Sequence, residues 1–146
     1  MNFRFSGSFD VVHPPAEVYG LLADPNRFAP LLPDFESVEK TGEDLYIVKL
    51  RVGISHIRGT ASLRLRLAEA NPPVHAVYEG KGDVPGGITT LRAGFDLESA
   101  GSGTRVNWTG RAQIAGRLAG LAGGLLEPLA RKNLDKLIDS LKAALS

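Results

Sequence analysis

Apolar and polar residues alternate through most of residues 3–114, and this alternation predicts β-strands. The clearest example is residues 57–67. Apolar or small side chains occupy one face of this segment, at Ile57, Gly59, Ala61, Leu63, Leu65 and Leu67. Polar and basic side chains occupy the other face, at Arg58, Thr60, Ser62, Arg64 and Arg66. The pattern is typical of a half-buried antiparallel strand with a basic outer face.

Weaker alternation of the same kind predicts further strands over residues 3–12, 35–41, 45–52, 74–79, 91–97 and 105–114. Gly53, Asn71-Pro72-Pro73 and Gly101-Ser102-Gly103 are predicted to break or turn the chain between strands. Residues 80–87 contain four glycines and one proline. This segment is predicted to be a loop, either a mobile loop at the mouth of a cavity or a long hairpin.

Helical patterns flank the strands. Pro15 to Leu22 reads as a short helix, because proline is tolerated in a first helical turn. Asp24-Pro25 is expected to begin a second short helical segment, which Pro33 closes.

The last segment, from about Arg117 to Leu145, predicts a long helix, because leucines recur in it at helical spacing. Four glycines lie at its start or inside it: Gly116, Gly120, Gly123 and Gly124. Each interior glycine costs about 1 kcal/mol relative to alanine, and Pro128 is expected to kink the helix. Such a smooth apolar helix indicates close approach by the sheet, a ligand or a partner. Whether the glycines provide room, mobility or tight packing stays open.

The elements together predict one α+β domain over residues 1–146, in which a curved antiparallel sheet of about six or seven strands wraps around the C-terminal helix. Inward side chains then either fill the core or line an apolar ligand cavity. The candidate cavity-lining residues are Ala61, Leu63, Tyr78, Phe95, Trp108, Ala112, Leu118, Leu121 and Leu125. Tyr78 and Trp108 could each offer one polar atom to a ligand. The candidate gate residues are Gly80, Gly86, Gly87, Gly120, Gly124 and Pro128.

The composition and the motifs of the chain exclude several kinds of functional site. The net charge of +1 gives no bias toward nucleic acid, and the absence of cysteine excludes disulfides, thiol catalysis and thiolate metal sites. His13, His56 and His75 are isolated, so neither a metal site nor a cofactor is expected. We find no motif of a catalytic serine or a phosphate-binding loop. A cytoplasmic protein is expected, because the sequence shows neither a secretory signal nor an apolar run long enough to span a bilayer.

Several arginines are expected to share the outer face of the sheet: Arg58, Arg64, Arg66, Arg105 and Arg111. Two interpretations are open. They form an ordinary solvated face, or they form a docking surface for anionic lipid headgroups or for an acidic enzyme partner.

Short phrases along nearly the whole chain carry a family resemblance. They are Phe5-Ser6-Gly7-Ser8-Phe9, Pro15-Ala16-Glu17-Val18-Tyr19, Leu22-Ala23-Asp24-Pro25, Leu32-Pro33-Asp34-Phe35-Glu36-Ser37, Lys40-Thr41-Gly42-Glu43-Asp44, Glu79-Gly80-Lys81-Gly82, Gly116-Arg117-Leu118-Ala119 and Ala130-Arg131-Lys132. In order and spacing they resemble the CoxG family of carbon monoxide dehydrogenase proteins. This family belongs to the START-like, or SRPBCC, superfamily, which has the helix-grip fold. One departure is Leu31-Leu32-Pro33-Asp34-Phe35, where the family typically has Cys-Ile-Pro-Gly-Cys.

The resemblance implies a non-enzymatic accessory protein that binds a lipophilic molecule, such as a quinone or lipid, between sheet and helix. The implied partners are the subunits of a carbon monoxide dehydrogenase-type molybdenum hydroxylase, with peripheral contact at the inner membrane face. One alternative is an enzyme like the polyketide cyclases and aromatases. The apolar inward positions argue against it, and Glu17, Asp34 or His75 pointing into the cavity would favour it. Another alternative is an assembly chaperone without a ligand.

Overall fold

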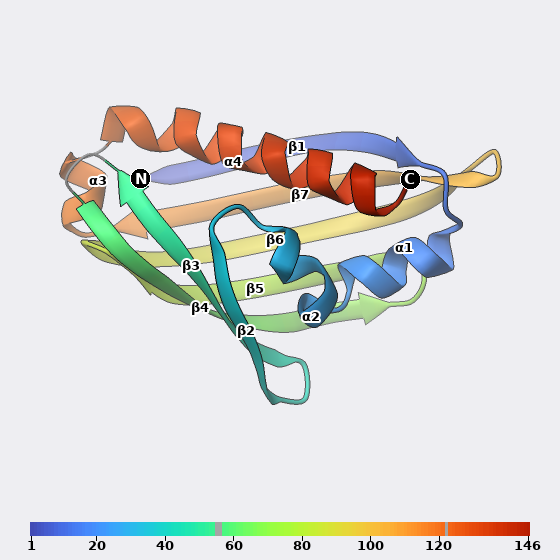
Figure 1. The fold of residues 1–146 in the computed structure, drawn as a ribbon, viewed down its shortest axis with the longest axis horizontal. Helices are drawn as coiled ribbons and strands as arrows, with labels where there is room; N and C mark the ends of the chain where they lie inside the picture. The colour runs from blue at the N-terminus through green and yellow to red at the C-terminus, as the bar shows by residue number, and fades with distance from the viewer. Residues whose placement is uncertain (55–56, 122) are drawn as a thin grey trace.

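A seven-stranded sheet carries helices on one of its faces in the computed structural model, which describes residues 1–54, 57–121 and 123–146 (Figure 1). The side chains of residues 121–123 lie outside the described part. The strands are β1 (Asn2–Val11), β2 (Phe35–Gly42), β3 (Leu45–Ile54), β4 (Ile57–Asn71), β5 (His75–Val84), β6 (Gly87–Ala100) and β7 (Gly103–Ala115). The helices are α1 (Pro15–Leu22), α2 (Pro25–Phe28), the 3-10 helix η1 (Ala29–Leu31), α3 (Arg117–Leu121) and α4 (Gly123–Ala144).

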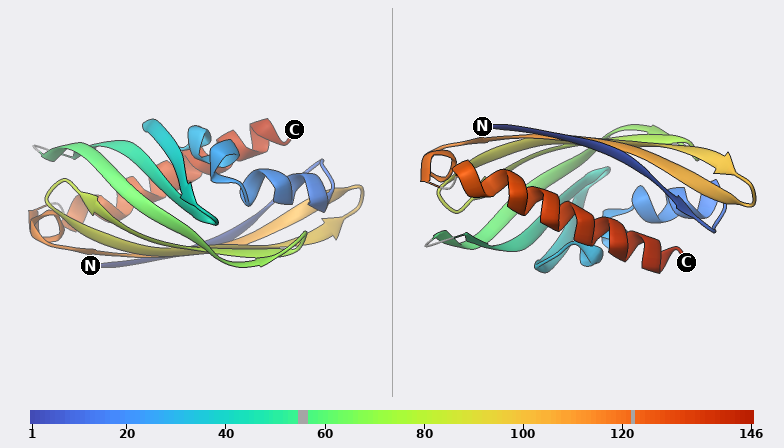
Figure 2. Two further views of the ribbon diagram at one scale, coloured as in Figure 1. Left: turned by 90° about the horizontal axis from the view of Figure 1, so that it is seen from below. Right: turned by 90° about the horizontal axis from the view of Figure 1, so that it is seen from above.

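The strands follow the order β1-β7-β6-β5-β4-β3-β2, and every neighbouring pair is antiparallel. From β2 to β7, strands that are consecutive in sequence are therefore adjacent in the sheet. The first strand, β1, pairs with the last, β7. The sheet is curved, and α1, α2 and α4 lie on its concave side (Figure 2). The predicted α+β architecture of a curved sheet, two short helices and a C-terminal helix is confirmed.

Local sequence signals explain where the helices begin. The Asp24 carboxylate caps α2 by accepting a hydrogen bond from the backbone N–H of Asn26 at 3.0 Å. Gly116 has a φ of +103°, a left-handed conformation that favours glycine, and it turns the chain from β7 into α3. The predicted C-terminal helix is described as α3 and α4 on either side of residue 122, which lies outside the described residues, and Pro128 lies inside α4.

Glycine was a poor guide to turns in β3 and β5. Residues 80–87 are not a mobile loop but the end of a long hairpin, the second of the two predicted alternatives, because β5 continues to Val84 and β6 begins at Gly87. Gly80 lies inside β5 where side chains from both neighbouring strands crowd together. A Cβ there would come within 2.8 Å of a Leu65 methyl carbon and 2.9 Å of Leu91 Cγ. Gly53 likewise lies inside β3, opposite Arg58, and is not a turn residue.

Three clusters of buried apolar residues hold the helices against the sheet. The first joins α1 and the C-terminal part of α4 to the sheet and includes Val18 and Leu141. The second includes Leu118 and lies where α3 and the start of α4 meet β1. The third joins Ala29 of η1 to Val48 of β3. Helix α4 runs diagonally across the sheet (Figure 1). The second cluster attaches its first part to the sheet, and the first cluster attaches its C-terminal part.

Candidate functional site

The middle of the concave face is formed by one row of residues that the strand register aligns. We call this row the Gly110 row. From β1 to β4 it contains Phe5, Gly110, Ala93, Tyr78 and Leu67. Ala93 and Gly110 belong to none of the three buried clusters, although they lie between them. The apolar face is therefore closely packed at its ends and less so at its centre.

Open space lies directly above Gly110. A Cβ built on this residue would meet no atom within 4 Å, and Ala93 beside it is only half-buried. On the helices, a Cβ on Gly120 or Gly124 would also meet nothing within 4 Å, and both residues are exposed to solvent. At these three positions the missing side chains leave room and do not serve close packing.

One cation lies at the margin of this region. The guanidinium of Arg131, on α4, stands 4.5 Å from the centre of the Phe5 ring on β1. Phe5 is half-buried, and its ring belongs to the Gly110 row. A cation over an aromatic face is held there by the ring quadrupole. The centre of the concave face thus combines apolar walls with one charged group near β1.

Tyr78 is a structural residue and not a free ligand group. Its hydroxyl donates a hydrogen bond of 2.8 Å to the carbonyl oxygen of Leu22 at the end of α1. The ring packs against Phe28 with centroids 5.5 Å apart, and burial raises the pKa of Tyr78. The carbonyl oxygen of Leu22 at the end of α1 therefore takes the hydrogen bond that this hydroxyl donates, and a ligand could only donate to its oxygen.

Trp108 lies next to the Gly110 row, on the side of α1. Its ring covers Gly7, where a Cβ would come within 2.8 Å of the indole Cζ2 atom. The side chain is half-buried against the first cluster, and it is the single tryptophan of the chain. Phe95, also a candidate, is buried in that cluster and meets the edge of the Tyr19 ring.

The remaining candidates for cavity lining are dispersed. Ala61 and Leu118 are buried, and Leu63 and Ala112 are half-buried on the concave face. Leu125 does not face the sheet: its side chain is 56% exposed, because Leu126 takes the inward position in that turn of α4. The side chain of Leu121 lies outside the described residues.

The candidate gate residues do not lie together in the fold. Gly86 and Gly87 lie at the β5–β6 turn against α3, where the Gly86 carbonyl accepts a hydrogen bond of 2.7 Å from the N–H of Leu118. Gly80 lies in mid-strand, away from this junction. Gly120 and Gly124 border open space, and Pro128 is exposed within α4. The β5–β6 turn and the start of the helical segment are thus in direct contact.

The three candidate acid–base residues lie away from the concave centre. Glu17 pairs with His13 at the surface, Asp34 is exposed, and His75 lies on the convex face. Two polar residues are buried among the described residues, Thr89 and Thr104, and each hydroxyl donates to a backbone carbonyl. His56 lies outside the described residues. Within the described part of the chain, no cluster of three His, Asp or Glu side chains is arranged to hold a metal ion.

His75 is held between two carboxylates on the convex face. Its Nε2 lies 3.1 Å from Glu69 and its Nδ1 lies 2.8 Å from Asp96. The hydrogen bonds with Glu69 and then with Asp96 raise the pKa of His75. The hydrogen bonds with His75 and then with Arg92 lower the pKa of Glu69.

These shifts predict a pH dependence of folding stability. A raised pKa in the folded state stabilises the fold below the unfolded histidine pKa of about 6.5, and this contribution is lost as the pH rises through the folded value. Urea unfolding at a series of pH values above about 6 should therefore show a falling midpoint. His75→Gln should flatten that fall, and an unchanged slope in this variant would contradict the assignment to His75.

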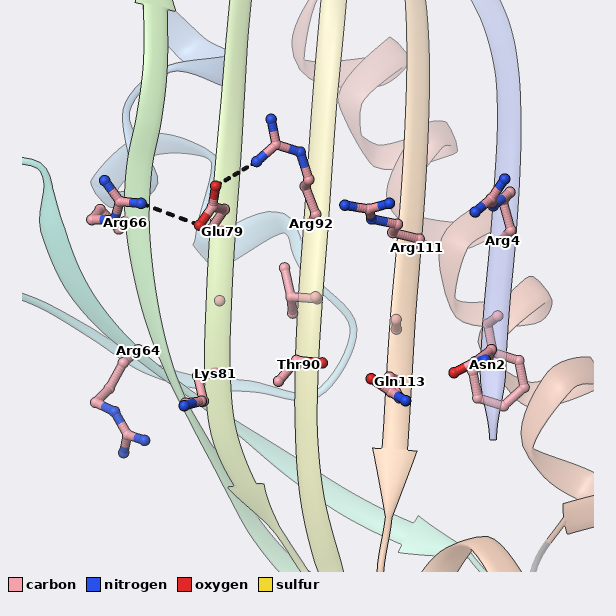
Figure 3. A pocket seen from close by; sticks show the side chains of 14 residues that line it. Asn2, Arg4, Arg64, Arg66, Glu79, Lys81, Thr90, Arg92, Arg111 and Gln113 are labelled. Carbon is pink, nitrogen blue, oxygen red and sulfur yellow. Dashed lines mark hydrogen bonds and ion pairs between the residues drawn. The ribbon is translucent and has the colours of Figure 1, made fainter.

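The convex face carries a hollow of its own, an open trough of about 770 Å³ that we call the basic trough (Figure 3). Two rows of side chains form its walls. The first row contains Arg4, Arg111, Arg92, Glu79 and Arg66, aligned from β1 to β4. The second row contains Asn2, Gln113, Thr90, Lys81 and Arg64, two residues further along each strand.

The predicted arginines share the convex face by register, but not all of them line the basic trough. Arg64, Arg66 and Arg111 line the basic trough, but Arg58 and Arg105 do not. Arg105 is instead neutralised by Asp10 at 3.0 Å and Glu98 at 3.8 Å. Arg4, Lys81 and Arg92 were missed. The outward alternation of Arg4 and Arg92 was visible in the sequence, whereas Lys81 lay in the segment predicted to be a loop. The register that brings the three residues together was not visible.

The sequence of this chain matches a known protein family over most of its length. Residues 7–146 match the sequence profile of CoxG, the family described as the G subunit of carbon monoxide dehydrogenase. The chain belongs to the CoxG family. No curated protein sequence matches it.

Solved structures share the fold of this CoxG-family chain. A conserved protein from Geobacillus kaustophilus superposes with a TM-score of 0.86 at 22% identity, covering 98% of this chain and 95% of that one. A START superfamily protein from Mycobacterium smegmatis gives a TM-score of 0.74 at 11% identity, with 97% and 96% coverage. The di-domain ARO/CYC StfQ from the steffimycin biosynthetic pathway gives 0.67 at 13% identity, with 99% and 51% coverage. The predicted START-like fold is confirmed.

One departure from the CoxG pattern has a structural correlate. Asp34 stands where the family typically has the glycine of Cys-Ile-Pro-Gly-Cys, and its φ is +59°. Aspartate is one of the few residues with a side chain that tolerate this left-handed conformation, although glycine adopts it more easily. Asp34 thus forms the turn before β2 in a conformation that a glycine would also adopt.

Among the described residues, none of the helices has the length and apolar character needed to cross a bilayer.

Proposed function

We propose that this chain binds a lipophilic small molecule between the centre of the sheet and α4, without catalysing a reaction. The observation that carries the proposal is the open space over Gly110, bordered by half-buried Ala93 and by Phe5. An apolar ring or isoprenoid tail placed there would be removed from water, at a gain of about 25 cal/mol per Å² of buried apolar surface. Membership of the CoxG family supports a ligand-binding or accessory role.

A quinone is the ligand that we favour. Its ring would lie in the apolar centre and its carbonyl oxygens would face Arg131, the cation at the margin of the Gly110 row. In this proposal the chain presents the quinone to a carbon monoxide dehydrogenase-type molybdenum hydroxylase at the membrane surface. The contact between the β5–β6 turn and α3 would be the part that opens to admit the ligand.

A cyclase- or aromatase-like enzyme is the second candidate, because the StfQ protein shares the fold. Such chemistry needs an acid or a base inside the cavity to carry out proton transfer. Here Glu17, Asp34 and His75 lie elsewhere, and the two buried threonines donate to the backbone. The side-chain chemistry of the concave centre therefore favours binding over catalysis.

The single tryptophan provides the test. Trp108 lies beside the Gly110 row, so a quinone bound there should quench its fluorescence. Titration with decylubiquinone, which carries a ten-carbon tail, should give saturable quenching. Lipid extraction of the purified protein followed by mass spectrometry should identify a co-purified apolar molecule.

The outcomes separate the candidates. Absence of both quenching and co-purified lipid would overturn the ligand proposal. If the protein then still captured molybdenum hydroxylase subunits in a pulldown, an assembly chaperone without a ligand would be favoured. Conversion of a polyketide substrate by the purified protein would favour the enzyme.

A further inference from the structure

The basic trough concentrates positive charge on a chain that is almost neutral overall. Six basic side chains and one acidic side chain line it, although the net charge of the chain is +1. The helices lie behind the sheet in Figure 3, so the trough is on the face opposite the proposed lipophilic site. Any function of the trough is therefore separate from the Gly110 row, and it does not depend on the function proposed above.

Several of these cations lie directly beside one another without an acidic partner. The register places Arg111 opposite both Arg4 and Arg92, and it places Arg64 opposite Lys81. Like charges in opposed cross-strand positions destabilise a sheet. Among the described residues, Arg4, Arg111, Lys81 and Arg64 form no ion pair. Their repulsion is uncompensated within the chain, and an external anion would relieve it.

The centre of the trough is different, because it already holds an acid. Glu79 accepts a hydrogen bond from Arg66 at 3.1 Å and another from Arg92 (Figure 3). Arg92 also reaches Glu69 at 2.6 Å. The trough therefore has two free cationic pairs at diagonally opposite ends, Arg4 with Arg111 and Lys81 with Arg64, and a largely neutralised middle.

Strand geometry gives the dimensions of the trough. The two walls are two residues apart along the strands, which is about 7 Å, and the floor between them is sheet backbone. From the spacing of strands, the two free cationic pairs are about 16 Å apart. A helix about 10 Å wide does not enter such a trough, and a flat bilayer does not reach its floor. An extended chain advances about 3.3 Å per residue, so acidic groups about five residues apart would meet both pairs.

We propose that the basic trough binds an extended acidic segment of a partner protein, in which two clusters of carboxylates are separated by a few uncharged residues. The carboxylate clusters would pair with Arg4 and Arg111 at one end and with Lys81 and Arg64 at the other. The uncharged spacer would pass Glu79, which repels a continuous run of negative charge. Arginine presents a planar fork that binds carboxylates through paired hydrogen bonds.

The test uses the whole chain and fluorescein-labelled peptides, with binding measured by fluorescence anisotropy. Each peptide carries two Glu-Glu pairs separated by zero to six serine or glycine residues, and the controls replace glutamate with glutamine. Affinity should be highest for spacers of about three to five residues and should fall as salt rises to about 0.15 M. The glutamine peptides should not bind.

Variants assign the binding to the trough. Arg111→Gln should weaken peptide binding about tenfold while leaving the urea midpoint unchanged or higher, because it removes repulsion from Arg4 and Arg92. Glu79→Gln should raise the affinity and abolish the preference for spaced charges. The matched control is Lys132→Gln, which removes the same charge from the exposed face of α4 and should change neither property.

Each contrary result overturns the proposal. Equal binding of all spacer lengths, or equal effects of Arg111→Gln and Lys132→Gln, would show only non-specific attraction. Inorganic triphosphate that displaces the best peptide at lower concentration than the peptide itself would assign the trough to a compact phosphate ligand. Phosphatidylglycerol vesicles that bind through Arg111, when no peptide does, would assign it to a lipid surface.

Discussion

Replacement of Gly110 by leucine is expected to abolish binding of a lipophilic molecule while leaving the fold intact. The new side chain would project into the space where a Cβ meets no atom within 4 Å. It would occupy the volume that the ligand needs, and we expect affinity to fall by roughly 100-fold, or about 2.7 kcal/mol. Fluorescence of Trp108 during a decylubiquinone titration measures this change.

The stability of the Gly110→Leu variant should stay unchanged or rise slightly, although its affinity for the ligand falls. Glycine weakens a strand, so a larger residue that meets no obstruction should preserve or slightly raise the melting temperature. Gly53→Leu is the matched control, because Gly53 also lies within a strand where an added Cβ would meet no atom within 4 Å, but on the convex face. That variant should bind quinone normally. Normal binding by Gly110→Leu would place the ligand elsewhere.

Replacement of Gly116 by valine is expected to be the most destabilising change at the end of the sheet that carries α3. Its φ of +103° is strained for any residue with a side chain, and most for a β-branched one. A Cβ would also come within 2.9 Å of Gly87 Cα and 3.0 Å of the Gly86 carbonyl oxygen, and backbone atoms yield little. We expect a loss of about 3 kcal/mol, which lowers the melting temperature by about 10 °C.

Substitution of a nearby glycine, Gly120, is expected to raise the stability of the protein. Gly120 lies in α3, and a Cβ added there would meet no atom within 4 Å, so Gly120→Ala should stabilise the protein by up to about 1 kcal/mol through helix propensity. Calorimetry of the two variants separates the effects. If both variants lost stability equally, the strain at Gly116 would not be the cause, and general sensitivity of this end of the molecule would explain the loss.

The strand faces could be predicted from the sequence, because a period of two assigns each side chain to one side of a sheet. This is why the concave positions of Ala61, Leu63 and Ala112 were found in advance. The pattern does not show how deeply each side chain is buried. Leu125 fits a helical period as well as Leu126 does, but only the docking angle of α4 decides which of them is buried.

Glycine misled the prediction where its small size mattered more than its conformational freedom. Gly80 looked like part of a loop, yet it lies in a strand between the side chains of Leu65 and Leu91. Those contacts come from other strands, and no local signal reports them. At Gly116, by contrast, the positive φ follows from the local change from strand to helix, which the sequence pattern does show.

The basic trough shows the same limit at longer range. Alternation alone identifies outward arginines such as Arg64 and Arg111. It does not show that Arg111 lies between Arg4 and Arg92, because the three residues come from strands far apart in the sequence. Nor does it show that Asp10 and Glu98 neutralise Arg105.

The pairing of the first strand with the last has a consequence for synthesis on the ribosome. Strands β3 to β7 can add to β2 one after another as they emerge, because each of them pairs with the strand made just before it. Strand β1 is made first but must wait for β7, whose residues follow about 100 positions later, or about 5–20 s at ordinary rates of translation. During that interval the apolar side chains of Phe3, Phe5 and Phe9 are without their final neighbours. Strand β1 therefore stays open to aggregation for longer than the strands that pair as soon as they are made.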